Sequence, residues 1–179
     1  MAEDAKHREH GDPREQLWEL LDEFTFTMLT THDTIGGRDG MRARPMAQHL
    51  DREAGVIRFL SNRTAGKVEE IADEHDVALI YADAGDSRYV SVSGRATQTT
   101  DRALIKRLWD AGAEIWFEGD AETADVVVIE VRPLEAEYWR QDDNALARGF
   151  KLVKGFLSDE QPDVGANAKI DFSNPSEAA

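Results

Sequence analysis

Residues 24–31 read FTFTMLTT, and in this stretch the spacing of apolar residues changes from helical to extended. Phe24, Phe26 and Met28 alternate with threonine, so their side chains share one face of a strand. Residues 12–23 carry a capping aspartate, a proline at the first helical position and leucines at helical spacing, which predicts an amphipathic helix. The chain therefore passes from a short helix into a sheet.

Further short strands follow, separated by turns. Residues 32–40 and 51–55 predict turns, and Gly94 indicates a bulge. We expect Pro133 to end a buried strand, because proline lacks the N–H that a ladder needs. The expected strands are residues 24–31, 41–50, 56–61, 77–81, 89–97, 126–131 and 135–140.

The other helices expected are short, at residues 67–75, 101–109 and 145–157, with capping residues at 61–64 before the first and a loop at 112–125. Six or seven mostly antiparallel strands with short helices predict a mainly β (α+β) fold, a small barrel with helices over its openings. The expected division is a flexible N-terminus (1–11), one barrel domain (12–157) and a C-terminal loop or tail (158–179).

Composition argues against several classes of function. The chain has 179 residues, 41% of them hydrophobic, which suffices for one soluble domain with its own core. A formal net charge of -15 disfavours nucleic acid and anionic membrane surfaces as partners. Without cysteine the chain has no disulfide and no thiolate nucleophile. A polar first segment and the lack of a long apolar window lead us to expect a cytoplasmic protein.

The sequence carries no metal or nucleotide fingerprint. Its five histidines are dispersed without an HExxH pattern, and its glycines form neither GxGxxG nor a Walker loop. His49 could face a pocket, but a lone strand histidine is more often solvated or hydrogen-bonded locally. We therefore expect no metal site.

Two neighbouring segments gather positive charge. Arg42 and Arg44 are two residues apart, so on a strand they project from one face, and an anion between them would offset their repulsion. Residues 61–67 place hydroxyl groups and Lys67 at a helix N-terminus, where free N–H groups attract phosphate. The alternatives are an arginine pair neutralised by the chain's own acids and an ordinary capped helix.

Aromatic residues concentrate in the second half of the chain, and most of them are expected in the core. Trp116 and Phe117 are the exception, because a loop has no need of two large apolar side chains unless something covers them. A second subunit is the commoner cover, and a ligand ring is the alternative.

The order of motifs resembles the pyridoxamine 5'-phosphate oxidase-like superfamily, the split barrels that bind flavin mononucleotide (FMN). The similarity covers residues 14–172. The motifs are RARPM at 42–46, FLSNRTAGK at 59–67, RYVSVSGRA at 88–96 and EYW at 137–139, with IWFEGD at 115–120 and FKLVKGFL at 150–157 resembling the general stress protein branch.

This resemblance implies a split barrel that forms a homodimer, with two FMN molecules at the subunit interface. Gly66 and Lys67 match the phosphate-binding pair, and Tyr89 stands where the oxidases place a glutamine that reaches the flavin. Trp139 is a further candidate near the ring. The cofactor-binding residues that the resemblance implies are Arg42, Arg44, Pro45, Met46, Leu60, Ser61, Gly66, Lys67, Tyr89 and Trp116.

The chain departs from the oxidases after EYW, where it continues QDDN and lacks their arginine-histidine pattern. Oxidation of pyridoxamine phosphate is therefore not expected. We hypothesise a flavin-dependent oxidoreductase that acts on an unidentified small molecule. One alternative is a flavin-binding general stress protein without turnover, and another is a barrel that has exchanged FMN for haem or a deazaflavin.

Overall fold

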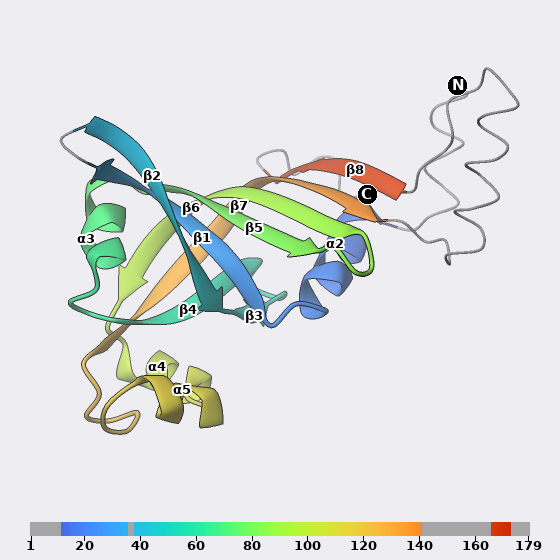
Figure 1. Cartoon of the computed structure of the whole chain (residues 1–179). Coiled ribbons are helices and arrows are strands. Elements are labelled where there is room, and N and C mark those ends of the chain that lie inside the picture. The colour runs from blue at the N-terminus through green and yellow to red at the C-terminus, as the bar shows by residue number, and fades with distance from the viewer. Residues whose placement is uncertain (1–11, 36–37, 141–165, 173–179) are drawn as a thin grey trace, which may run out of the picture.

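The alternating segment forms β1 (Phe26–Ile35), one strand of an eight-stranded antiparallel sheet (Figure 1). The structure is a computed structural model that describes residues 12–35, 38–140 and 166–172. The sheet curls into a split barrel with short helices, which confirms the expected mainly β fold. The other elements are α2 (Pro13–Asp22), β2 (Arg38–Ala47), β3 (His49–Asp51), β4 (Val56–Asn62), α3 (Gly66–Asp73), β5 (Asp76–Asp83), β6 (Arg88–Thr99), α4 (Arg102–Leu108), α5 (Ala111–Trp116), β7 (Val126–Arg140) and β8 (Ala166–Asp171).

The strands follow the order β2-β1-β5-β6-β7-β4-β3, and β8 pairs with the second half of β7. The two edge strands, β2 and β3, are consecutive in the chain and meet at Gln48, so the predicted strand 41–50 is in fact two. The side chain of Gln48 connects this corner to the end of α2 and the residues after it. Its amide group donates to the carbonyl groups of Leu21 and Phe24, both at 2.7 Å. Its side-chain oxygen accepts from the Tyr81 hydroxyl at 2.8 Å.

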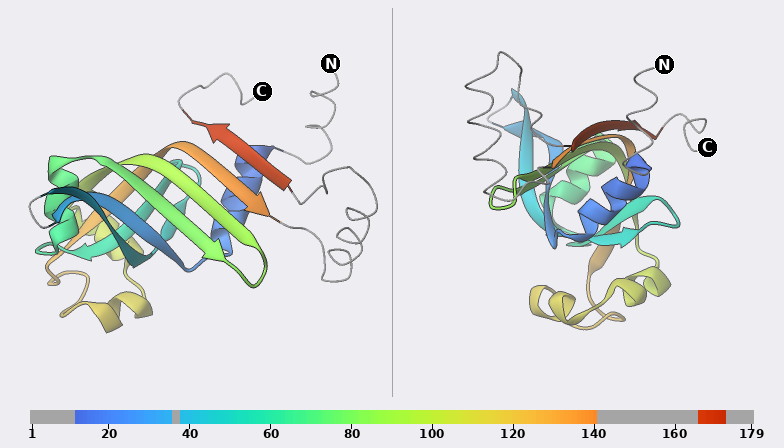
Figure 2. Two further views of the ribbon diagram at one scale, coloured as in Figure 1. Left: turned by 45° about the horizontal axis from the view of Figure 1, so that its top comes forward. Right: turned by 90° about the vertical axis from the view of Figure 1, so that its right-hand side faces the viewer.

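The helices α2 and α3 cover opposite ends of the barrel, as expected (Figure 2). Asp12 caps α2 by accepting from the backbone N–H of Arg14 at 2.9 Å, and Pro13 is its first residue. Leu17, Leu20 and Leu21 of α2 join the barrel core.

The outer face of β1 is unusual because it carries the more apolar residues. Thr27, Leu29 and Thr31 point inward and are buried, whereas Phe26 is 52% exposed and Met28 is 39% exposed. The apolar alternation of the sequence therefore marks an open face of the sheet rather than its core.

Several other expectations about elements were wrong. The expected turn at 32–40 is mostly strand, because β1 continues to Ile35 and β2 begins at Arg38. Residues 111–116 form α5, with Asp110 as its cap, where a loop was expected. Pro133 does not end its strand, because β7 continues through it at a bulge opposite Gly94, where a missing N–H is tolerated. Ala166–Asp171 is a strand within the expected tail. The segments expected at 1–11 and 145–157 lie outside the described residues.

Candidate phosphate site

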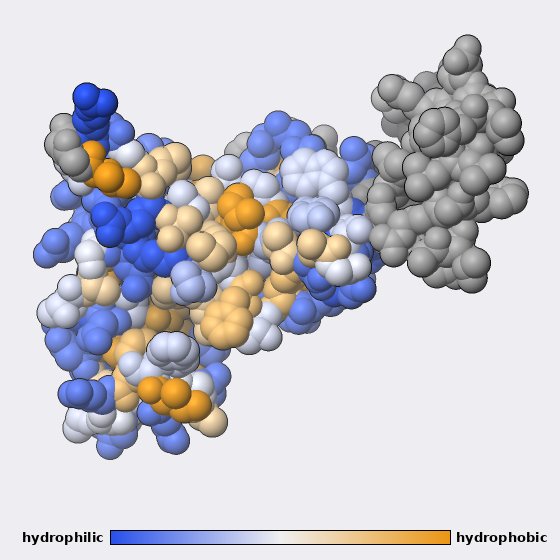
Figure 3. Space-filling model, viewed as in Figure 1, coloured by the Kyte–Doolittle hydropathy of each residue, from blue (hydrophilic) through white to orange (hydrophobic). Residues whose placement is uncertain are grey.

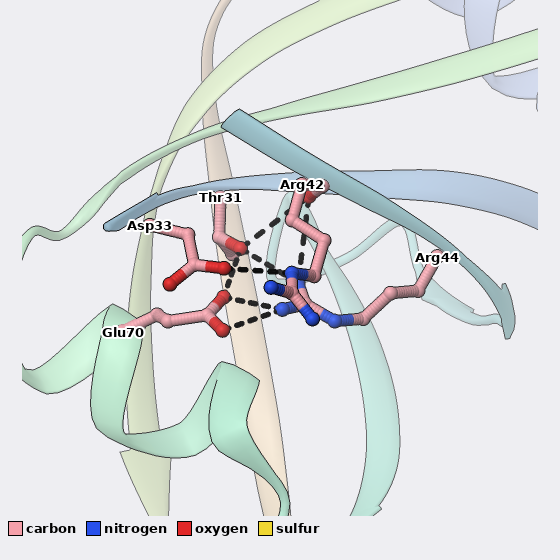
Figure 4. A network of polar contacts seen from close by, with 5 residues as sticks. All are labelled: Thr31, Asp33, Arg42, Arg44 and Glu70. Carbon is pink, nitrogen blue, oxygen red and sulfur yellow. Dashed lines mark hydrogen bonds and ion pairs between the residues drawn. The ribbon is translucent and has the colours of Figure 1, made fainter. Parts of the chain in front are cut away.

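The face of β2 that carries Arg42, Arg44 and Met46 points toward the inside of the barrel, and the shared face follows from their spacing. Met46 is buried in the main core. Arg44 extends from β2 toward Glu70 of α3 (Figure 4). Arg42 is nearer the start of β2, and its side chain is 54% exposed. Pro45 points the other way and is exposed.

Arg44 is held by Glu70 of α3 and Thr31 of β1. Its Nη2 donates to both carboxylate oxygens of Glu70, at 2.5 and 2.6 Å, and its Nη1 donates to Thr31 Oγ1 at 2.7 Å. The Thr31 hydroxyl in turn donates to Glu70 Oε2 at 2.5 Å. The side chains of Arg44 and Glu70 are only 19% and 13% exposed, so water screens this pair weakly.

Arg42 also has a carboxylate partner, since its Nε lies 2.6 Å from Asp33 Oδ2. Both arginines are thus paired with acids of the chain. This agrees with the alternative in which the chain's own acids, rather than a bound anion, neutralise the arginine pair. Sequence reasoning missed Thr31, Asp33 and Glu70. A usable signal existed for Glu70, because it lies three residues after Lys67 and so shares its helix face.

The N-terminus of α3 has no side-chain cap. Its cap position is Ala65, which offers no side-chain acceptor, so the expectation that residues 61–64 cap the helix was wrong. A Cβ built on Gly66 would meet only Glu70 Oε1, at 3.4 Å, so the Glu70 carboxylate lies against the first turn of the helix. The first turn of a helix carries free N–H groups and a partial positive charge.

Lys67 belongs to the same cluster. It is half-buried, and burial together with the nearby Arg44 charge lowers the pKa of its ammonium group, while the Glu70 charge opposes this shift. Lys67 is therefore close enough to Arg44 and Glu70 for their charges to interact. Two cations, one hydroxyl and a helix N-terminus converge here, which is the set of groups that binds a phosphate monoester.

The other expected site residues lie apart from this cluster or inside the protein. Leu60 packs in the second core beneath α4 and α5, and Ser61 is buried with its hydroxyl donating to the Asn62 carbonyl at 3.2 Å. Tyr89 and Trp139 are register partners on β6 and β7, each about 40% exposed. Tyr89 pairs with the end of β5 that is farther from α3. Within a single copy of the chain, Tyr89 therefore does not lie near Arg44.

The two aromatic residues expected on a loop have different surroundings. Phe117 packs on Trp109, with ring centroids 6.0 Å apart, and so is covered within its own chain. Trp116 ends α5 and is 73% exposed. The structure does not bring Trp116 to the Arg44 cluster, because α5 packs with α4 in the second core, away from α3.

The described residues offer no metal centre and no membrane helix. Among them, no three His, Asp or Glu side chains gather as a metal site. Within the same ranges, no helix has the length and apolar character to span a bilayer.

Comparison with known proteins agrees with this architecture. The family described as "Pyridoxamine 5'-phosphate oxidase like" matches residues 12–163. Protein bli-3 of Neurospora crassa is 27% identical, over 81% of this chain and 73% of its own. A structure assigned as general stress protein 26 from Jannaschia sp. CCS1 is 25% identical with a TM-score of 0.69, covering 88% of this chain and 97% of its own. The general stress FMN/FAD binding protein of Xanthomonas citri is 22% identical with a TM-score of 0.61, covering 73% and 90%.

Proposed function

Because the chain belongs to the pyridoxamine 5'-phosphate oxidase-like family, we propose that it binds FMN and transfers electrons between the flavin and an unidentified small molecule. The observation that carries the proposal is that Arg44, Lys67 and Thr31 meet at the N-terminus of α3, which no side chain caps, in a chain of net charge -15. The name of the Xanthomonas citri protein, which includes FMN/FAD binding, supports a flavin.

These groups fit a flavin phosphate. Arg44 and Lys67 supply charge, the backbone N–H groups of Gly66 and Lys67 point out of the first helical turn, and the Thr31 hydroxyl supplies a further hydrogen bond. When bound, the flavin would supply the redox chemistry. The chain's own part would be to hold the phosphate and orient the ring, with Arg42, Pro45, Met46, Leu60 and Ser61 as proposed neighbours.

A second copy of the chain is part of this proposal. Phe26, Met28, Ile80, Tyr89 and Trp139 are all about 40 to 50% exposed and lie on strands β1, β5, β6 and β7. Figure 3 shows apolar atoms across the middle of this face. A homodimer through this face would remove that surface from water. It would also allow Tyr89 and Trp116 of one copy to border a flavin whose phosphate is held by Arg44 of the other copy.

The test is uptake of FMN by the purified protein, measured by flavin fluorescence with sedimentation in parallel. We expect stoichiometric binding to a dimer, and no binding would refute the proposal. The alternative is a general stress protein that binds flavin without turnover. Anaerobic mixing with NADH or NADPH separates the two, since reduction of the bound flavin is expected only of the oxidoreductase.

A further inference from the structure

The Glu70 carboxylate lies where the proposed site expects an anionic ligand. The carboxylate accepts two hydrogen bonds from Nη2 of Arg44 and one from the Thr31 hydroxyl, and it lies against the first turn of α3. The bonds to Arg44 and Thr31 are ones that a phosphate oxygen would accept, and a phosphate at this place would also face the helix N-terminus. Figure 4 shows the carboxylate between α3 and the arginines that reach over from β2.

A phosphate cannot bind the Nη groups of Arg44 without changing this arrangement. Nη2 of Arg44 is fully engaged by Glu70, and Nη1 already bonds to Thr31 and lies 3.4 Å from the Arg42 carbonyl oxygen. A phosphate monoester also brings a charge of about -1.5 to -2 at neutral pH. Next to Glu70, that charge would meet a carboxylate that is 13% exposed and therefore poorly screened.

We propose that Glu70 is an internal competitor for the phosphate subsite, whose carboxylate must leave Arg44 before a phosphate can bind. A glutamate at the first turns of a helix can do this by rotating about its side-chain bonds, without moving the backbone. Glu70 would thereby lower the affinity for phosphorylated ligands while leaving unphosphorylated ones unaffected. The inference rests on the proposed function only in taking the ligand's anion to be a phosphate.

A different role for Glu70 makes the opposite prediction. If its carboxylate stays in place and holds Arg44 toward the ligand, its loss should weaken FMN binding. Glu70→Gln separates the two, because glutamine keeps the size and one acceptor oxygen but removes the charge. Glu69→Gln is the matched control, since Glu69 is the preceding residue of the same helix and is exposed.

The experiment measures FMN and riboflavin binding by fluorescence titration in wild type, Glu70→Gln and Glu69→Gln. We expect Glu70→Gln to bind FMN about tenfold tighter, riboflavin unchanged and Glu69→Gln like wild type. Equal or weaker FMN binding by Glu70→Gln would overturn the proposal, as would an equal gain for riboflavin. Glu70→Ala repeats the test if the glutamine variant does not fold.

A second experiment uses inorganic phosphate and does not depend on flavin binding. Its stabilisation of each variant is measured by thermal unfolding over a range of phosphate concentrations with chloride as the salt control. Glu70→Gln is expected to respond at a lower phosphate concentration than wild type, and an equal response would overturn the proposal. If no variant takes up FMN while this difference persists, the proposed function fails and the role of Glu70 stands.

Discussion

The Arg44–Glu70 pair should be energetically coupled, and four proteins measure the coupling: wild type, Arg44→Met, Glu70→Met and the double variant. Nη2 of Arg44 donates to both carboxylate oxygens of Glu70. Charge centres about 4 Å apart attract by about 4 kcal/mol at an effective dielectric constant of about 20. The cost of desolvating the two charges offsets part of this attraction, because both side chains are less than one-fifth exposed in the folded protein. We expect a coupling energy of about 2 kcal/mol.

The two single variants should lose more free energy of unfolding than the double variant. Arg44→Met leaves the Glu70 carboxylate with Thr31 as a donor and only the Lys67 charge nearby, and Glu70→Met leaves the Arg44 guanidinium without its carboxylate. Each change is expected to lower the free energy of unfolding by about 1.5 kcal/mol. The double variant replaces both charges by apolar side chains of similar length. It should lie within about 1 kcal/mol of wild type, because such replacements are often neutral.

Urea unfolding followed by tryptophan fluorescence measures these values, without flavin and at one protein concentration, because dimer stability depends on concentration. Trp18 is buried and reports on the core. Single effects that add up in the double variant to within about 0.5 kcal/mol would refute the reasoning.

Three further predictions concern the site, the sheet and pH. Lys67→Ala should weaken FMN binding about tenfold or more in a fluorescence titration, whereas Lys106→Ala, an exposed lysine of α4, should not. Gly94→Ala should lower the free energy of unfolding by about 2 kcal/mol, since its Cβ would lie 2.7 Å from the Arg132 carbonyl oxygen; a melting temperature like that of wild type would contradict this. Burial lowers the pKa of His49 from 6.5, against the opposing charge of Asp110, so its contribution to stability is full above pH 6.5 and is lost as pH falls through the folded-state pKa. His49→Gln should therefore flatten the stability profile below that pH in urea titrations.

Part of the candidate site was predictable from local spacing. Two-residue spacing on a strand places Arg42 and Arg44 on one face, and a lysine after a strand end falls in the first turn of α3. Their partners were not predictable in this way. Glu70 lies 26 residues from Arg44 in the chain, and Thr31 meets it only because β1 and β2 pair in one register.

The expected elements that failed share a physical cause. The strand β8 is made by pairing with β7, about 30 residues earlier, rather than by its own propensity. Pro133 is accepted within β7 because the bulge at Gly94 removes the need for its N–H. In both cases the partner strand determines whether the segment is a strand, and the sequence of the segment alone does not identify that partner.

The sequence by itself determined the period of each segment, and with it the antiparallel barrel and the helices at its ends; the order of its motifs indicated the family. Tertiary structure decided which side of each period faces inward. On β1 the buried side is Thr27, Leu29 and Thr31, while Phe26 and Met28 remain open. The physical reason is that alternation defines two faces locally, but only the curl of the whole sheet determines which face encloses the core.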